Sequence, residues 1–307
     1  MSAKAHARYI ANFIPAILLI YLTKWIFQQY VISCLMLTLI NCFFSGIFST
    51  ILLKCLSISN KRTFSTTNYR RLIIISIFFT LFVLFSNRSL EFNTLITYQL
   101  IKIQIPPTLM LIQWIQFQFQ WSLTREKFLE NYSFAVLAAF AIICISTLIT
   151  TYADLYFHFN GYLYACTSVF SNVFYQTLIE TEPSTTFYER TRLVQIQSFI
   201  STGILICLWP FVESMNDFYN WDLFLDWDLI ISLFLGSILA FLVNLSIVSC
   251  IQNDAAIGYN LVGQMKTFVI IYFGSHLFDE TLTDRQKLSA ILPTIACLIY
   301  IYLRRYS

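Results

Sequence analysis

Ten apolar segments, each close to the length that crosses a lipid bilayer, occupy most of this 307-residue sequence. About 20 consecutive apolar residues in a helix span the hydrocarbon core of a membrane. Short loops separate the segments, which leaves no room for an appended soluble domain. The sequence therefore predicts an all-α polytopic membrane protein with ten transmembrane helices. The predicted spans are residues 9–29, 31–53, 70–86, 94–116, 132–151, 160–179, 193–213, 229–251, 256–277 and 286–303.

The composition supports this interpretation and excludes other protein classes. Charged residues make up 11% of the chain and hydrophobic residues 58%, with a mean hydropathy of +0.68. Soluble domains contain about 25% charged residues, and a chain this apolar is not disordered. The cysteines have no regular spacing and the histidines are isolated, so we expect no metal site and no cofactor. The lipid bilayer is the expected surrounding, and no nucleic-acid partner is expected.

The positions of the basic residues predict the orientation of the chain. With both termini in the cytosol, 13 Lys and Arg residues fall on the cytosolic side and 3 on the opposite side. Membrane proteins concentrate Lys and Arg in their cytosolic loops. The bias therefore supports an even number of spans. The sequon at residues 87–89 lies on the non-cytosolic side, in a loop so short that we expect no glycan on it.

Three lysines remain inside the predicted spans: Lys24, Lys102 and Lys266. A lysine near the centre of a bilayer costs roughly 2.5 to 3.5 kcal/mol unless it faces a cavity or a partner. No Asp or Glu lies near the middle of any predicted span, so an anionic ligand is the partner that this pattern favours. Lys24 lies near the end of its span, where snorkelling to the membrane surface is an alternative.

The two halves of the chain contain similar motifs. Residues 96–102 read ITYQLIK and residues 257–266 read IGYNLVGQMK, so each has a tyrosine, an amide and then a lysine. Many transporters consist of two inverted repeats with a binding site near the midplane of the membrane. We therefore expect a first five-helix repeat at 1–150 and a second at 151–307, together forming one transmembrane domain.

The same motifs supply candidate ligand-binding residues. Tyr98 and Lys102 share a helix face, as do Tyr259 and Lys266. Pro106 is expected to weaken or kink the helix beside Lys102, and a lysine at an opened turn next to an aromatic ring suits a phosphate and a stacked base. Packing within the bundle is the alternative role for the tyrosines and for the amides in later spans.

These residues resemble the nucleotide-sugar and triose-phosphate transporter branch of the drug/metabolite transporter superfamily, and within solute carrier family 35 the E-type members most closely. The resemblance extends over about residues 12–303. The matching stretches are KWIF at 24–27, SNRSLEFNTLITYQLIKIQIPP at 86–107, FLVNLSI at 241–247 and YNLVGQMKT at 259–267.

The resemblance implies a drug/metabolite transporter fold with ten spans in two inverted repeats, and no enzymatic activity. It implies alternating access that exchanges a nucleotide sugar, or a related phosphorylated sugar, for a nucleoside monophosphate or phosphate across a Golgi or endoplasmic reticulum membrane. The matched lysines would contact substrate phosphates, and the tyrosines and Asn260 would contact the base, ribose or sugar. Thr23 and Ile103 depart from the usual pattern, which leaves the substrate open. The full candidate set is Lys102, Lys266, Tyr98, Tyr259, Asn260, Lys24, Tyr175 and Gln197.

Two other function classes remain as alternatives. An ion-coupled carrier of a neutral or cationic metabolite is the first, although the sequence lacks the intramembrane carboxylate expected of such a carrier. A membrane-embedded enzyme would need a catalytic set at one membrane face, which the isolated His158 and His276 do not supply. The sequence leaves the nucleotide, the sugar, the organelle and the oligomeric state open, and a homodimer is one of the alternatives.

Overall fold

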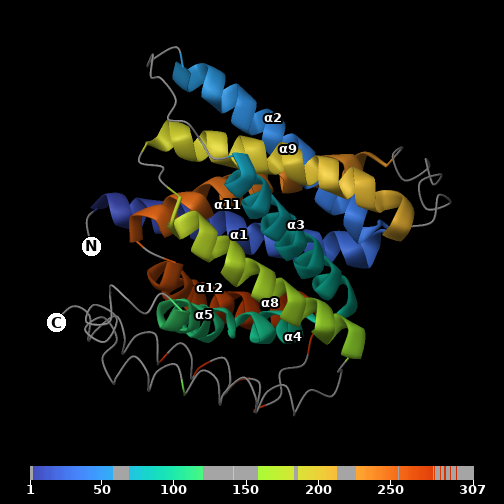
Figure 1. The fold of residues 1–307 in the computed structure, drawn as a ribbon. Helices are drawn as coiled ribbons and strands as arrows, with labels where there is room; N and C mark the ends of the chain where they lie inside the picture. Colours follow the sequence, from blue (N-terminus) through green and yellow to red (C-terminus); the bar gives the residue numbers. More distant parts are fainter. Residues whose placement is uncertain are drawn as a thin grey trace.

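The computed structural model describes residues 3–57, 69–119, 158–182, 186–212, 226–254 and 256–278, and single residues at 141, 280, 284, 287, 291 and 295. Within these ranges the chain forms nine α-helices (Figure 1), which agrees with the predicted all-α class. The helices are α1 (Ala3–Gln29), α2 (Cys34–Ser57), α3 (Tyr69–Phe92), α4 (Leu95–Lys102), α5 (Ile105–Phe119), α8 (Phe159–Glu180), α9 (Phe187–Val212), α11 (Trp227–Asp254) and α12 (Ala256–Leu277).

Eight of the ten predicted spans fall on these helices. The other two, at 132–151 and 286–303, lie outside the described residues apart from single positions. The ten-helix organisation in two inverted repeats therefore stays a prediction. In the described chain, six segments are long and apolar enough to cross a bilayer, so the protein is a multi-pass membrane protein. They are Arg8–Gln29, Cys34–Leu56, Tyr69–Phe92, Leu95–Gln113, Phe187–Val212 and Trp227–Asn253.

The main helix contacts join the first half of the sequence to the second. Helix α3 packs along α8, α2 along α9, α1 along α11, and α4 against α12 (Figure 1). In Figure 1, α2 and α9 lie at one edge of the bundle and α4, α5 and α12 at the other. Exchanging the two halves leaves this set of pairs unchanged, as an inverted repeat would require. The core and any central site are consequently built from both halves.

Small hydroxyl side chains fill the positions where these helices approach closely. Ser76 and Ser201 are completely buried, and Thr80 is almost so. The Thr80 hydroxyl donates to the Ser76 carbonyl on its own helix at 2.7 Å, and it also forms a hydrogen bond with the Ser201 hydroxyl on α9 at 2.8 Å. Interfaces between membrane helices favour small residues and interhelical hydrogen bonds. In this chain, which has only seven glycines, serine and threonine are the small residues that allow these helices to pack closely.

The predicted span at 94–116 consists of two helices. Helix α4 ends at Lys102 and α5 begins at Ile105. Pro106 and Pro107 have no N–H to donate to the carbonyls of Lys102 and Ile103, so the hydrogen-bond ladder of an α-helix stops there. The kink expected at Pro106 is therefore a complete break, and it leaves Lys102 at a helix end.

Candidate functional site

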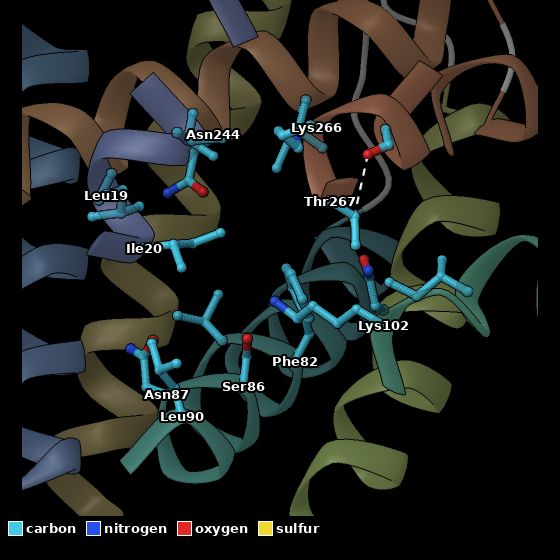
Figure 2. A pocket seen from close by; sticks show the side chains of 18 of the residues that line it. Leu19, Ile20, Phe82, Ser86, Asn87, Leu90, Lys102, Asn244, Lys266 and Thr267 are labelled. Atoms are coloured by element: carbon cyan, nitrogen blue, oxygen red, sulfur yellow. Dashed lines mark hydrogen bonds between the residues drawn. The ribbon is translucent and has the colours of Figure 1, made fainter. Parts of the chain in front are cut away.

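A cavity of about 180 Å³ lies at the centre of the bundle (Figure 2). Each helix named above except α9 contributes residues to its wall. Among the described lining residues there are two lysines, Lys102 and Lys266, and no Asp or Glu. Figure 2 shows the two lysine side chains on opposite sides of the open space. The wall of the cavity therefore carries positive charge without a carboxylate from the described chain to balance it.

Lys102 is held by aromatic and hydroxyl groups. Its ammonium donates to the Tyr98 hydroxyl, and it lies 4.2 Å from the centroid of the Tyr98 ring and 5.7 Å from that of Phe82. The Tyr98 hydroxyl also bonds to the Ser86 hydroxyl at 2.7 Å. Aromatic faces attract cations, but none of these partners neutralises the charge. The ammonium stays available to an anion in the cavity.

Lys266 has a similar environment on the opposite wall. Its ammonium donates to the Asn12 side-chain oxygen on α1 at 3.1 Å and lies 5.7 Å from the centroid of the Tyr259 ring. The Asn12 amide nitrogen in turn donates to the Ser246 hydroxyl on α11 at 2.8 Å. Each cavity lysine therefore lies beside a tyrosine of its own helix, as the helical spacing predicts, and each has only neutral partners in the described chain.

Three carboxamides form a hydrogen-bonded group on the wall made by α8 and α12. The Asn260 amide nitrogen donates to the Gln176 side-chain oxygen at 2.5 Å, and the Gln176 nitrogen donates back to the Asn260 oxygen at 3.3 Å. The Gln176 nitrogen also donates to the Asn172 oxygen at 3.1 Å. All three residues line the cavity. Asn172 and Gln176 were absent from the predicted set, although their spacing of one helical turn was a usable signal.

Five of the eight predicted site residues line the cavity: Tyr98, Lys102, Tyr259, Asn260 and Lys266. The structure does not bring the other three to it. Their hydrogen bonds are with other protein groups, and they are not among the described lining residues. These three are Lys24, Tyr175 and Gln197.

Tyr175 and Gln197 are paired inside the protein. Both side chains are almost fully buried, and the Tyr175 hydroxyl donates to the Gln197 side-chain oxygen at 3.3 Å. This bond joins α8 to α9, the one named helix that contributes nothing to the cavity wall. The pair therefore fits the packing role that was the alternative for these residues.

Asn87 is a cavity residue that the sequence did not suggest. It lies within α3, lines the cavity and donates from its amide nitrogen to the Thr38 hydroxyl at 2.9 Å. The sequon at 87–89 is thus part of a helix instead of the short loop that was expected. An amide enclosed in this way is a poor acceptor for a glycan. Asn87 belongs to the stretch 86–107 that resembles the transporter branch, and this resemblance was the sequence feature that could have indicated a cavity residue here.

The described residues offer no clear metal centre. They contain no group of three or more His, Cys, Asp or Glu side chains that is arranged to hold an ion. The cavity instead combines ammonium groups, carboxamides, hydroxyls and aromatic rings. Such a lining can bind an anion and can also hydrogen-bond to the neutral part of the same ligand.

Comparisons with known proteins agree with this chemistry. No protein-family model matches the chain. The chain is 23% identical over 215 residues to the UDP-rhamnose/UDP-galactose transporter 2 of Arabidopsis thaliana, over 70% of this chain and 59% of the relative. It is 23% identical over 289 residues to the GDP-mannose transporter GONST5 of the same plant, over 93% of this chain and 81% of the relative. The chain therefore spans less than two thirds of the first relative and most of the second.

A solved structure supports the fold. One crystal structure covers 97% of this chain and 99% of its own with a TM-score of 0.61, at 12% identity. That likeness concerns the fold alone. The named relatives are transporters, which agrees with the prediction that the chain is not an enzyme. The E-type assignment within the transporter branch stays a prediction.

Proposed function

We propose that this chain, a distant homologue of plant nucleotide-sugar transporters, is a secondary-active antiporter. It exchanges a nucleotide sugar, or a related phosphorylated sugar, for a nucleoside monophosphate or phosphate by alternating access. The observation that carries the proposal is the central cavity, where Lys102 and Lys266 face each other and the described lining contains no carboxylate.

The phosphate groups of the substrate bind between the two lysines. An ammonium group in a low-dielectric surrounding is costly unless it has a counter-charge. A diphosphate carries a negative charge on each phosphoryl group, so one ligand balances both lysines. Charge-assisted hydrogen bonds of this kind are about twice as strong as neutral ones.

The neutral parts of the substrate contact the remaining wall. Tyr98 and Tyr259 offer aromatic faces and hydroxyls, and Asn260 belongs to the carboxamide group on α8 and α12. These residues are suited to a base, a ribose or a sugar, because all three moieties combine flat or apolar surfaces with hydrogen-bonding edges.

The charge of the cavity also explains why transport is an exchange. Without a ligand, two ammonium groups lack a counter-charge inside the membrane, and closing the cavity around them is unfavourable. A bound anion removes this cost, so the loaded carrier reorients faster than the empty one. Uptake then depends on a counter-substrate that returns the binding site to the outside.

We propose a Golgi or endoplasmic reticulum membrane as the location, as the resemblance to nucleotide-sugar transporters implies. We also propose that both termini lie in the cytosol, because 13 basic residues then lie on the cytosolic side and 3 on the other. Light scattering of the purified protein tests whether the chain forms a homodimer, which the sequence left open.

Transport into liposomes tests the proposal. The purified full chain is reconstituted, the vesicles are preloaded with a nucleoside monophosphate or left empty, and uptake of labelled UDP- and GDP-sugars is measured. We expect uptake only into vesicles that contain the matching monophosphate. Equal uptake into empty vesicles contradicts exchange. Uptake of a neutral or cationic metabolite driven by a pH or sodium gradient would favour the ion-coupled carrier instead.

A further inference from the structure

Two glutamines on the cavity wall each have an amide atom without a hydrogen-bond partner in the described chain. Gln99 on α4 is 2% exposed and its Nε2 is unpaired, whereas Gln264 on α12 is 5% exposed and its Oε1 is unpaired. Both residues line the cavity. A buried amide group left unpaired destabilises the protein, because it loses its hydrogen bonds to water without replacing them. Groups of this kind in a native protein call for a partner from outside the chain.

Two neighbouring amides on the cavity wall, in contrast, do have hydrogen-bond partners. Gln176 and Asn260 satisfy each other with reciprocal hydrogen bonds, and the Asn260 nitrogen also donates to the Ala256 carbonyl at 2.9 Å. Gln264 follows Asn260 by one turn of α12, on the same helix face. The same wall therefore contains carboxamides that bind one another and a carboxamide that does not.

Gln99 is close in sequence to a proposed phosphate-binding lysine. It precedes Lys102 by three residues on α4, so the two residues are neighbours on the helix surface. Helices α4 and α12 are in contact with each other. Gln99 and Gln264 consequently line the same cavity from two adjoining helices, next to the charged part of the site.

We propose that Gln99 and Gln264 are specificity-determining residues that bind a neutral group of the substrate able both to accept and to donate hydrogen bonds. The Gln99 amide nitrogen donates to an oxygen of the ligand, and the Gln264 amide oxygen accepts from an O–H or N–H of the ligand. Sugar hydroxyls and the edge of a nucleobase both offer this pair of groups. The inference rests on the proposed function, because it names what the same cavity recognises besides phosphate.

An anion alone gains little from this pair. The oxygens of a phosphate ion act mainly as hydrogen-bond acceptors, so the Gln264 oxygen offers them no donor and repels their charge. The two glutamines therefore discriminate a nucleotide or nucleotide sugar from inorganic phosphate. A site built to hydrogen-bond a substrate group rejects analogues without that group, because its own buried polar atoms then stay unpaired.

The chain provides a matched control. Gln252 on α11 also has buried, unpaired amide atoms, in its case both Nε2 and Oε1, but it does not line the cavity. Replacing any of the three glutamines by methionine keeps the length and approximate volume of the side chain and removes both polar atoms. Only the two cavity variants should alter ligand recognition.

Ligand-induced changes in melting temperature test the inference. Wild type and the variants Gln99→Met, Gln264→Met and Gln252→Met are titrated with inorganic phosphate, with UMP and GMP, and with UDP-galactose and GDP-mannose. We expect each cavity variant to weaken binding of the recognised nucleotide ligands by roughly fivefold, as the loss of one hydrogen bond implies. Phosphate binding by Gln264→Met, and all binding by Gln252→Met, should be unchanged.

The ligand series identifies the group that is bound. Equal weakening for monophosphates and nucleotide sugars assigns the two glutamines to the base or ribose, and weakening for nucleotide sugars alone assigns them to the transferred sugar. If the cavity variants bind every nucleotide as wild type does, the amides are merely hydrated and the inference is wrong. An equal loss in Gln252→Met overturns it too.

Two further observations separate failure of the inference from other failures. If wild type binds no nucleotide at all, the proposed function itself is wrong, and this inference falls with it. The melting temperature without ligand reports whether each variant folds. Should a methionine variant not fold, Gln99→Asn or Gln264→Asn takes its place, since asparagine keeps the amide but withdraws it by one methylene group from the ligand.

Discussion

The ammonium of Lys24 lies 2.6 Å from the carbonyl oxygen of Asn93 and also donates to the carbonyl of Leu90 at 3.1 Å. Leu90 lies in the last turn of α3 and Asn93 directly follows that helix, where helix carbonyls have no intrahelical donor for their oxygens. Lys24 therefore fastens α1 to the turn between α3 and α4. This arrangement differs from the snorkelling that its position near a span end suggested, and Lys24 is not among the residues that line the cavity.

Lys24→Met should lower stability and leave nucleotide affinity unchanged. The substitution keeps the aliphatic stem but leaves two buried carbonyls without their donor, which costs about 1.5 to 3 kcal/mol for bonds to a charged group. The measurement is the melting temperature with and without a nucleoside monophosphate, and Lys54→Met on the exposed end of α2 is the control. Unchanged stability with lost binding would instead return Lys24 to the substrate site.

Lys102→Met and Lys266→Met should each abolish most transport while the protein still folds. Each substitution removes a charged hydrogen-bond donor from the cavity, which corresponds to about a 10- to 100-fold loss of nucleotide affinity. Apolar side chains replace buried charges at no cost in desolvation, so the melting temperature without ligand should not fall. Exchange in liposomes is measured beside Lys54→Met. Wild-type exchange by both cavity variants would remove the lysines from the mechanism.

The reciprocal bond between Gln176 and Asn260 should appear as a coupling energy. Gln176→Leu or Asn260→Leu leaves one buried amide without its partner and should destabilise the protein by about 1 to 3 kcal/mol. The double variant should lose less than the sum of the two, because it leaves neither amide of the pair behind. Melting temperatures of the four proteins complete the cycle. Strict additivity would show that the two amides do not support each other.

The sequence was most informative where one local property decided the outcome. The length of the apolar segments predicted eight spans that fall on helices. The lack of carboxylates in the spans predicted that the buried lysines face an anion, and Lys102 and Lys266 line the same cavity. It was less informative where a partner is distant along the chain. The carbonyls that bind Lys24 belong to another helix end, and the unpaired atoms of Gln99 and Gln264 are recognisable only once their neighbours are known.

The glycines show what the structure adds to a prediction from sequence. The sequence alone predicts that bulk at Gly258 or Gly263, which flank the Tyr259 motif, impairs transport more than bulk at Gly46, because a ligand or backbone would approach them closely. In the structure a Cβ at Gly46 would lie 2.9 Å from the Phe199 ring, whereas a Cβ at Gly263 would meet no atom of the described residues within 4 Å. The steric constraint inside the protein is therefore at Gly46, and Gly263 borders open cavity.

Replacement by leucine should therefore lower stability at Gly46 and transport activity at Gly263. Gly46→Leu must displace the Phe199 ring between α2 and α9, and overpacking of this kind typically costs about 1 to 3 kcal/mol, so its melting temperature should fall. Gly263→Leu should fold with a normal melting temperature but lose exchange and nucleotide binding, because its side chain occupies space meant for the ligand. Melting curves and liposome exchange on both variants distinguish the two effects. A folded Gly263→Leu protein with wild-type exchange would show that the substrate does not use this part of the cavity.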